Sequence, residues 1–231
     1  MLFWIDGKTR NELIKEDRNS EFLIKPLCRG TDIRKWRLLK NDLYIIYTHS
    51  NINIEDFPAI KNYLEKFKNK LESRAVKQPW WQLQQAQNKE GIWESRKILY
   101  PDICKESRFL IDESSTYSDM KGFVINSSSN YLLSILNSKL LWWYLKQICA
   151  VLGDPNNGGR LQLKRQYVEN IPLKIISISL QQPFIDKVDQ ILSLKKVNPE
   201  ADTSALEREI DFMVYALYGL SEEEIKIVEE S

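Results

Sequence analysis

The sequence predicts an α+β fold in which a mixed sheet is followed by a helical C-terminal extension. Short runs of β-branched and aromatic residues alternate with polar turns through most of the 231 residues, which favours strands of a sheet. Beyond residue 180, apolar residues recur at steps of three and four, which is typical of amphipathic helices. With 43% apolar residues the chain can form a substantial core. We therefore predict two parts, residues 1–180 and residues 181–231.

The N-terminal third is predicted to contain strands and two helices. Thr9 and Glu12 have the spacing of a capping box, which places a short helix over residues 9–17. A second helix over 57–73 follows from apolar residues that recur every three or four positions, with Pro58 in its first turn. β-Branched and aromatic residues predict strands at residues 2–5, 22–24 and 43–47.

The middle and C-terminal segments continue this pattern. The apolar segment 130–149 predicts buried helix, broken near Asn137 and Ser138. After a glycine-rich loop, helices are predicted from Pro183 onward, with Gly219 closing the second of them and Ser221 opening the last. The predicted strands are residues 97–100, 108–111, 122–125 and 160–164.

Charge is distributed unevenly along the chain. The formal net charge is only +1, but residues 200–231 contain ten acidic and two basic residues, so residues 1–199 carry a net charge of +9. A basic body can neutralise phosphates and displace their condensed counterions. We expect a cationic surface on the body that binds phosphates, and an acidic tail that faces away from those phosphates.

Composition argues against several other classes of protein. Three widely separated cysteines indicate no disulfide framework and favour a reducing compartment. The single histidine excludes a metal site built from several histidines, and we predict neither a metal site nor a catalytic residue. Polar residues interrupt the most apolar stretch, 131–151, which argues against a membrane span. We expect a cytoplasmic protein with no membrane partner.

A basic segment near the N-terminus is the first candidate binding site. Its cations surround an aromatic residue, Trp36, and Asp32 is the only acid between residues 25 and 40. This pattern suits a surface that lies against phosphates, although an ordinary solvated surface has the same composition. The predicted phosphate contacts are Lys25, Arg29, Arg34, Lys35 and Arg37.

Two further segments are candidates for contacts to bases. Gln82 and Gln84 follow Trp80 and Trp81; glutamine can pair with adenine in the major groove, whereas the tryptophans are expected to plug the core. Arg160, Gln162 and Lys164 alternate along a predicted strand and would project from one face. An ordinary surface turn is the alternative interpretation of this second segment.

Two alternative functions remain open at this point. Asp102 follows Pro101, and Asp119 stands two residues before Lys121, which loosely fits the PD-(D/E)xK pattern of metal-dependent nucleases. Such loose spacing is frequent by chance. The other alternative is a protein-interaction scaffold whose basic face binds an acidic partner.

Short motifs along nearly the whole chain resemble one family. They occur in the family's order, at Phe3–Asp6, Ile24–Leu27, Arg29–Ile33, Trp81–Leu83, Lys97–Pro101, Leu136–Leu140, Val168–Leu173 and Ile210–Ile225. The sequence resembles the C-terminal specificity domain of TaqI-like adenine-specific DNA methyltransferases, which also occurs in fused type IIG restriction–modification enzymes. Trp81–Leu83 departs from the family pattern at its second and third positions.

The resemblance implies that residues 1–180 are a mixed-sheet DNA target recognition domain with residues 181–231 as a helical extension. In that family this domain reads double-stranded DNA, chiefly in the major groove, while an upstream domain binds S-adenosylmethionine and methylates adenine. The Asn-Pro-Pro-Tyr motif of the methylating domain is absent here. We therefore expect a chain without a cofactor of its own that is not an enzyme alone. Its parent would be an S-adenosylmethionine-dependent adenine methyltransferase, with fusion to an endonuclease left open.

Overall fold

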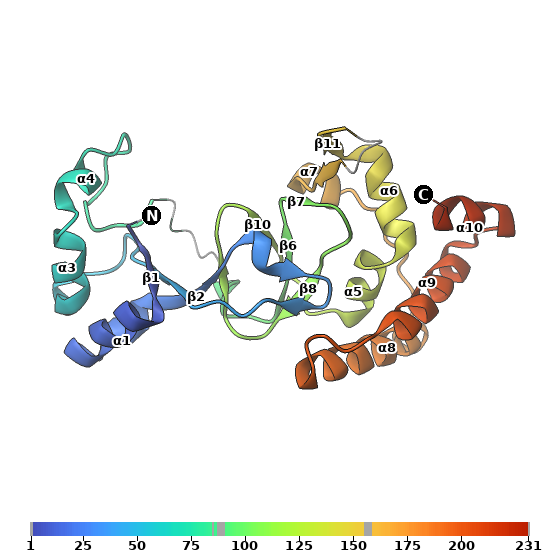
Figure 1. Ribbon diagram of the computed structural model, residues 1–231, viewed down its shortest axis with the longest axis horizontal. Coiled ribbons are helices and arrows are strands. Elements are labelled where there is room, and N and C mark those ends of the chain that lie inside the picture. The colour runs from blue at the N-terminus through green and yellow to red at the C-terminus, as the bar shows by residue number, and fades with distance from the viewer. Residues whose placement is uncertain (1, 85, 87–90, 155–158, 231) are drawn as a thin grey trace. The chain divides into compact units, whose positions relative to one another are not determined.

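The computed structural model describes residues 2–84, 86, 91–154 and 159–230. The chain folds into two compact units and passes between them more than once (Figure 1). Each unit is therefore assembled from segments that are far apart in the sequence. Unit 1 contains Met1–Cys28, Lys40–Ser95 and Glu113–Asp119; unit 2 contains Arg29–Leu39, Arg96–Asp112 and Met120–Ser231.

Unit 1 contains a four-stranded sheet in the order β1-β5-β2-β9. The strands are β1 (Trp4–Asp6), β2 (Ile24–Cys28), β5 (Leu43–Ile46) and β9 (Tyr117–Ser118). Strand β5 is antiparallel to β1 and β2, whereas β9 is parallel to β2 with Tyr117 opposite Leu27. The strands predicted at 2–5 and 43–47 are confirmed to within two residues.

Helices bury one apolar face each in unit 1. They are α1 (Gly7–Glu16), α2 (Ser20–Leu23), α3 (Pro58–Glu65) and α4 (Lys68–Glu72), with a 3₁₀ turn, η2, at Ile54–Asp56. Leu13 of α1, Ile60 and Leu64 of α3 and Leu71 of α4 are buried in the same core as Ile46 of β5. The periodicity of apolar residues thus predicted the buried face correctly.

Three local predictions in unit 1 were wrong. Asp6, not Thr9, caps the first helix, because its Oδ1 accepts a hydrogen bond from the Thr9 N–H at 2.8 Å. Residues 22–23 end helix α2, and the strand begins at Ile24 and includes Pro26. The helix predicted over 57–73 is interrupted at Phe67, whose backbone leaves the helical region (φ −115°, ψ 8°), and so it forms two shorter helices.

The described residues of unit 2 form three small sheets. Central strand β6 (Lys97–Pro101) pairs antiparallel with β8 (Leu110–Asp112) and β10 (Gly122–Ile125). Strand β12 (Arg160–Gln162) pairs with β11 (Ala150–Leu152) and β7 (Ile103–Cys104), and β3 (Ile33–Arg34) pairs with β4 (Arg37–Leu38). The four predicted strands of this region are confirmed, with ends shifted by up to two residues.

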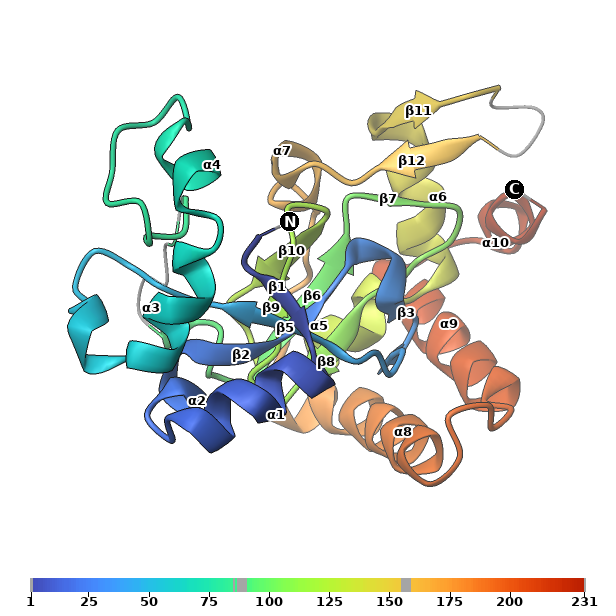
Figure 2. The same cartoon turned by 60° about the vertical axis from the view of Figure 1, so that its left-hand side comes forward.

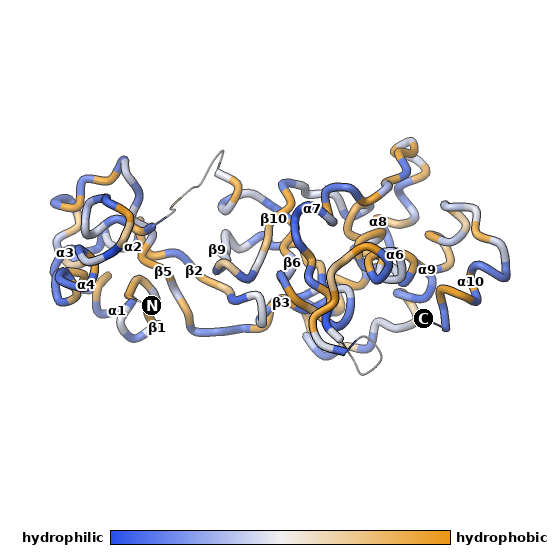
Figure 3. Tube along the Cα trace, turned by 90° about the horizontal axis from the view of Figure 1, so that it is seen from above, coloured by the Kyte–Doolittle hydropathy of each residue, from blue (hydrophilic) through white to orange (hydrophobic). Residues whose placement is uncertain are grey.

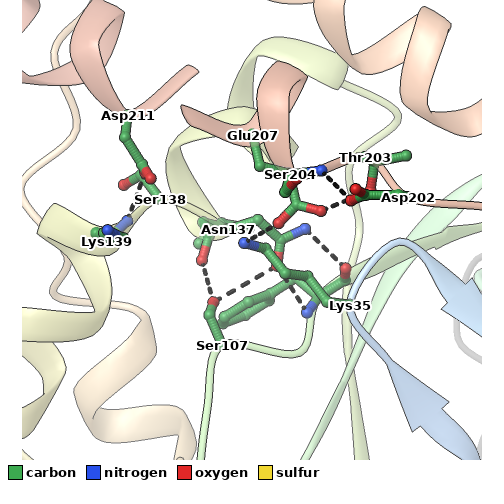
Figure 4. A network of polar contacts seen from close by, with 12 residues as sticks. Lys35, Ser107, Asn137, Ser138, Lys139, Asp202, Thr203, Ser204, Glu207 and Asp211 are labelled. Atoms are coloured by element: carbon green, nitrogen blue, oxygen red, sulfur yellow. Dashed lines mark hydrogen bonds and ion pairs between the residues drawn. The ribbon is translucent and has the colours of Figure 1, made fainter. Parts of the chain in front are cut away.

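A break at Asn137 and Ser138 separates α5 (Asn130–Leu136) from α6 (Lys139–Ile148), as predicted. The Ser138 hydroxyl accepts the Leu141 N–H at 3.2 Å and so caps α6. The buried Asn137 amide accepts the Phe109 N–H at 3.1 Å and donates to the Phe109 carbonyl at 2.9 Å (Figure 4). Asn137, at the break between the two helices, therefore connects them by hydrogen bonds to the segment before β8.

The C-terminal helices are part of the unit 2 core. Helix α8 (Ile178–Val197) lies beside α9 (Ser204–Tyr218), and α10 (Glu222–Glu229) follows (Figure 2). Val188 of α8 and Val214 of α9 are buried in one cluster with Ile98 of β6. Hydrophobic and hydrophilic residues succeed one another along these helices, as expected for packed amphipathic helices (Figure 3). The compact units have different bounds from residues 1–180 and 181–231, so the extent of a recognition domain stays a prediction.

The predicted ends of the C-terminal helices are largely confirmed. Gly219 closes α9 in the left-handed conformation (φ +75°), and Ser221 forms a capping box with Glu224 at the start of α10. Pro183, expected near the start of the first helix, lies inside α8. No described helix is long and apolar enough to span a bilayer.

Asp211 of α9 gives unit 2 a predicted dependence on pH. Burial raises the pKa of Asp211, although its carboxylate accepts the Lys139 N–H at 2.8 Å (Figure 4). A carboxyl with a raised folded-state pKa destabilises the fold once it ionises, so its contribution to stability falls as pH rises above the ordinary carboxyl range. We expect Asp211→Asn, which keeps the acceptor, to be at least as stable as the wild type near neutral pH. Urea denaturation of both proteins from about pH 4 to about pH 7 measures this, and an equal pH slope in both would contradict it.

Candidate nucleic-acid interface

A tight turn presents the basic segment of unit 2. A 3₁₀ turn, η1 (Gly30–Asp32), leads into the β3–β4 hairpin, and the Asp32 carboxylate accepts the Arg29 N–H at 2.8 Å. Gly30 is required here, because a Cβ atom would lie 2.1 Å from the Lys121 carbonyl oxygen. Trp36, between β3 and β4, adopts a positive φ of 67° and is buried. The Asp32 hydrogen bond and the close approach of Gly30 to Lys121 therefore fix the conformation of this turn.

The predicted phosphate contacts occupy both units. Lys25 is half-buried on β2 of unit 1, with its ammonium 5.3 Å from the centroid of the Phe22 ring. Arg29 is exposed in unit 2. The Arg34 guanidinium donates to the Thr31 carbonyl at 2.6 Å and the Ile33 carbonyl at 3.0 Å. Burial, followed by the charges of Arg108 and Arg37, lowers the pKa of Arg34, while Glu106 and Asp32 act in the opposite direction.

Two of these cations are ion-paired with the acidic tail. Lys35 Nζ lies 2.5 Å from a carboxylate oxygen of Glu207 (Figure 4), and Arg37 Nη2 lies 2.7 Å from Glu200. These two carboxylates therefore lie at predicted phosphate contacts, contrary to the expectation that the tail would face away from phosphates. No local pattern could indicate the pairing, because 163 residues separate Arg37 from Glu200.

The predicted glutamine readers lie on an irregular segment of unit 1. Gln82 is half-buried and Gln84 is exposed, while Trp80 and Trp81 pack partly buried against the core, as expected. Arg74 organises this segment: its guanidinium donates to the carbonyls of Gln82 and Trp80, both at 2.8 Å. We did not predict that role, and no local pattern in the sequence indicates it. Gln85 lies outside the described residues.

The third candidate segment has the predicted alternation. Leu161 and Leu163 are buried, whereas Arg160 is exposed and Gln162 and Lys164 are half-buried. The strand itself ends at Gln162, and residues 155–158, which precede it in the sequence, lie outside the described residues. Arg160, Gln162 and Lys164 therefore occupy the less buried side of one short segment.

Asp102 has ion-pair partners that sequence analysis did not predict. Its carboxylate, 3% exposed, lies 3.3 Å from Lys164 Nζ and 3.5 Å from Lys121 Nζ. The pair Asp102 and Lys121 is thus brought together, as the nuclease alternative requires, but within an ion-pair cluster. Among the described residues, no three His, Cys, Asp or Glu side chains are grouped to hold a metal ion. Apart from that proximity, the described residues give no support to the nuclease alternative.

Two known proteins similar to this chain are type II methyltransferases. Type II methyltransferase M.BanIII of Aneurinibacillus aneurinilyticus is 27% identical over 92% of this chain and 39% of its own length. Type II methyltransferase M.BstVI of Geobacillus stearothermophilus is 23% identical over 90% of this chain and 36% of its own length. The chain therefore spans less than two-fifths of either relative.

The fold also resembles that of a solved enzyme. The type IIL restriction–modification enzyme MmeI, solved in complex with DNA, superposes with a TM-score of 0.67 and 13% identity, over 95% of this chain and 31% of MmeI. Residues 25–173 match the model of the TaqI-like C-terminal specificity domain. The matched segment is more than half of the chain, and the chain belongs to the family of TaqI-like C-terminal specificity domains.

Proposed function

We propose that this chain is the sequence-specific DNA recognition module of an adenine-specific DNA methyltransferase of a type II restriction–modification system. The observation that carries the proposal is the family match over residues 25–173, together with two methyltransferases that align over nine-tenths of the chain. Methyl transfer and S-adenosylmethionine binding would belong to the part of the parent protein that this chain does not cover. The partners are then duplex DNA and that methylating part.

The charge distribution supports a DNA-binding role. A methyltransferase that acts on a base must extrude it from the duplex, which costs a few kcal/mol, so contacts elsewhere must hold the distorted DNA. Residues 1–199 carry a net charge of +9, and Arg34, Arg37 and Arg108 are close enough to one another to affect the pKa of Arg34. Such positive charge can supply affinity that does not depend on sequence.

Salt dependence tests the proposed function. If about six phosphates are neutralised, a log–log plot of affinity against salt should have a slope near −5. Fluorescence anisotropy of a labelled duplex with the full chain, measured from about 50 mM to about 200 mM salt, gives this slope. Binding that is absent, or that does not change with salt, would refute the proposal and favour a protein-interaction scaffold.

Arg160 and Arg29 should affect binding in different ways. A base contact sets preference at one position, whereas a phosphate contact strengthens binding to every sequence. We expect Arg160→Ala to relax preference at one base pair by about 1–3 kcal/mol, and Arg29→Gln to weaken all sequences alike. Sequencing the duplexes that each variant retains from a randomised pool measures both effects. Unchanged preference in Arg160→Ala would remove that residue from the proposed readers.

A further inference from the structure

A pocket in unit 1 has the composition of a ligand site. It has a volume of about 500 Å³, and its lining includes Lys25 of β2 and Tyr117 of β9. These two strands are neighbours in the sheet of unit 1 (Figure 2). This volume is within the range of small-molecule sites. The described residues that line it are Phe22, Leu23, Lys25, Tyr47, His49, Ser50, Asn51, Ala86, Glu94 and Tyr117.

Aromatic rings form much of the pocket wall and pack against one another. The Tyr47 and Tyr117 rings lie 4.6 Å apart between centroids, and the His49 ring lies 6.3 Å from that of Tyr47. Trp93 stacks on Tyr117 at 5.4 Å with an interplanar angle of 20°. Tyr47 is tilted by 58° against Tyr117 and by 52° against His49, so the rings meet at an angle around the pocket. Stacking on one such ring is a common way to bind an unstacked nucleobase.

The charged groups at the pocket are complementary to the parts of a nucleotide. Of the described lining residues, Lys25 and Glu94 are the charged ones. Glu94 accepts a hydrogen bond from the Tyr117 hydroxyl. A carboxylate at an aromatic wall can accept N–H groups of a base edge, whereas the Lys25 ammonium can bind a phosphate.

The Tyr47 hydroxyl is a further unusual feature of this wall. It is buried and has no hydrogen-bond partner within the described part of the chain. Burial, with the charge of Glu94, raises the pKa of Tyr47 to about 12, so the phenol stays protonated at neutral pH. Buried polar groups without partners are rare in native proteins, and a bound ligand or water would supply a partner for this hydroxyl.

We propose that this pocket binds one nucleotide, with the base against the aromatic wall and the phosphate at Lys25. This goes beyond the proposed function, which requires contacts to duplex DNA but no pocket for a separate nucleotide. The nucleotide has two sources, a free mononucleotide or an unstacked nucleotide of a DNA strand. The two sources share the same chemistry and can be separated by experiment.

Titration of the full chain with the four deoxynucleoside 5′-monophosphates, followed by tryptophan fluorescence, tests the free source. We expect saturable binding that Lys25→Gln weakens about tenfold and His49→Ala about fivefold. Lys77→Gln, at an exposed lysine of the same unit, should bind as the wild type does. The corresponding nucleosides should lose affinity in His49→Ala but not in Lys25→Gln, since they lack the phosphate.

A duplex with one bulged 2-aminopurine tests the DNA source. We expect the chain to quench its emission, and His49→Ala to quench it less at equal saturation. If the monophosphates bind but His49→Ala quenches the 2-aminopurine as the wild type does, the pocket binds a free nucleotide. If His49→Ala quenches less and no monophosphate binds, the pocket binds an unstacked nucleotide of DNA. If neither probe responds to His49→Ala while ordinary duplex still binds, this inference is wrong and the proposed function stands. Monophosphate binding without any duplex binding would instead support the pocket and contradict the proposed function.

Discussion

Replacing either partner of the Lys97–Asp112 ion pair alone should lower the free energy of unfolding by about 3–5 kcal/mol. Lys97 Nζ lies 2.6 Å from Asp112 Oδ2, and the two side chains are 0% and 4% exposed. They face each other across the β6–β8 ladder, where Lys97 is in register with Asp112. A single substitution such as Lys97→Met or Asp112→Leu removes the ion-pair partner of a charge that stays buried. The desolvation cost of that charge, rather than the lost attraction alone, causes the large expected effect.

The double variant Lys97→Met/Asp112→Leu should recover most of that loss. Apolar residues of similar size remove both desolvation costs together, and such replacements of buried pairs are often neutral or stabilising. Denaturant unfolding of the two single variants and the double variant measures the coupling between the sites. The exposed pair Arg165–Glu169, at 84% and 49% exposure, provides the control, since breaking it should cost about 1 kcal/mol or less. A loss in the double variant equal to the sum of the two single losses would show that the sites are not coupled and would contradict the expectation.

Local patterns in the sequence predicted the helices and strands better than the contacts between them. The break at Asn137 and Ser138 was predictable because polar residues interrupt an apolar segment, and Gly219 was predictable because a left-handed helix end favours glycine. The interruption at Phe67 was not, because the apolar stripe continues on both sides of it. Spacing identifies a buried face, but it does not determine whether one helix or two provide it.

The candidate site depends more on contacts between distant segments. Alternation along the sequence correctly separated Arg160 from the buried Leu161, since both are on one strand. In contrast, the pocket of unit 1 combines Lys25, His49, Glu94 and Tyr117 from four separate segments. No local motif relates these residues, so only the fold could bring them together. The same holds for the ion pairs between the basic hairpin and the tail.

The role of these ion pairs cannot be tested by simply removing the tail. Deleting residues 200–231 would take Ile210 and Val214 out of the unit 2 core, and loss of binding could then reflect unfolding. Glu200 and Glu207 can instead be neutralised individually, since Glu200 is 76% exposed and Glu207 is 22% exposed. Partly exposed ion pairs of this kind contribute little to stability, so the fold should tolerate their loss.

Glu200→Gln/Glu207→Gln should bind duplex DNA on the order of tenfold more tightly at low salt than the wild type. In the wild type the tail carboxylates are paired with Lys35 and Arg37, so under the proposed function they would compete with phosphates for these cations. Neutral glutamines end that competition, and two additional phosphate contacts would make the log–log salt slope steeper by about 2. Anisotropy across the same salt series measures both quantities.

A matched variant separates this effect from a general change in charge. Glu222→Gln/Glu223→Gln removes the same two charges from the first turn of α10, where no ion pair with the basic hairpin is observed among the described residues. Its slope should stay at the wild-type value, because the number of cations that contact phosphates is unchanged. If both double variants strengthen binding equally, net charge alone accounts for the gain. If neither does, Lys35 and Arg37 fasten the hairpin to α9 and to the segment before it rather than contact DNA.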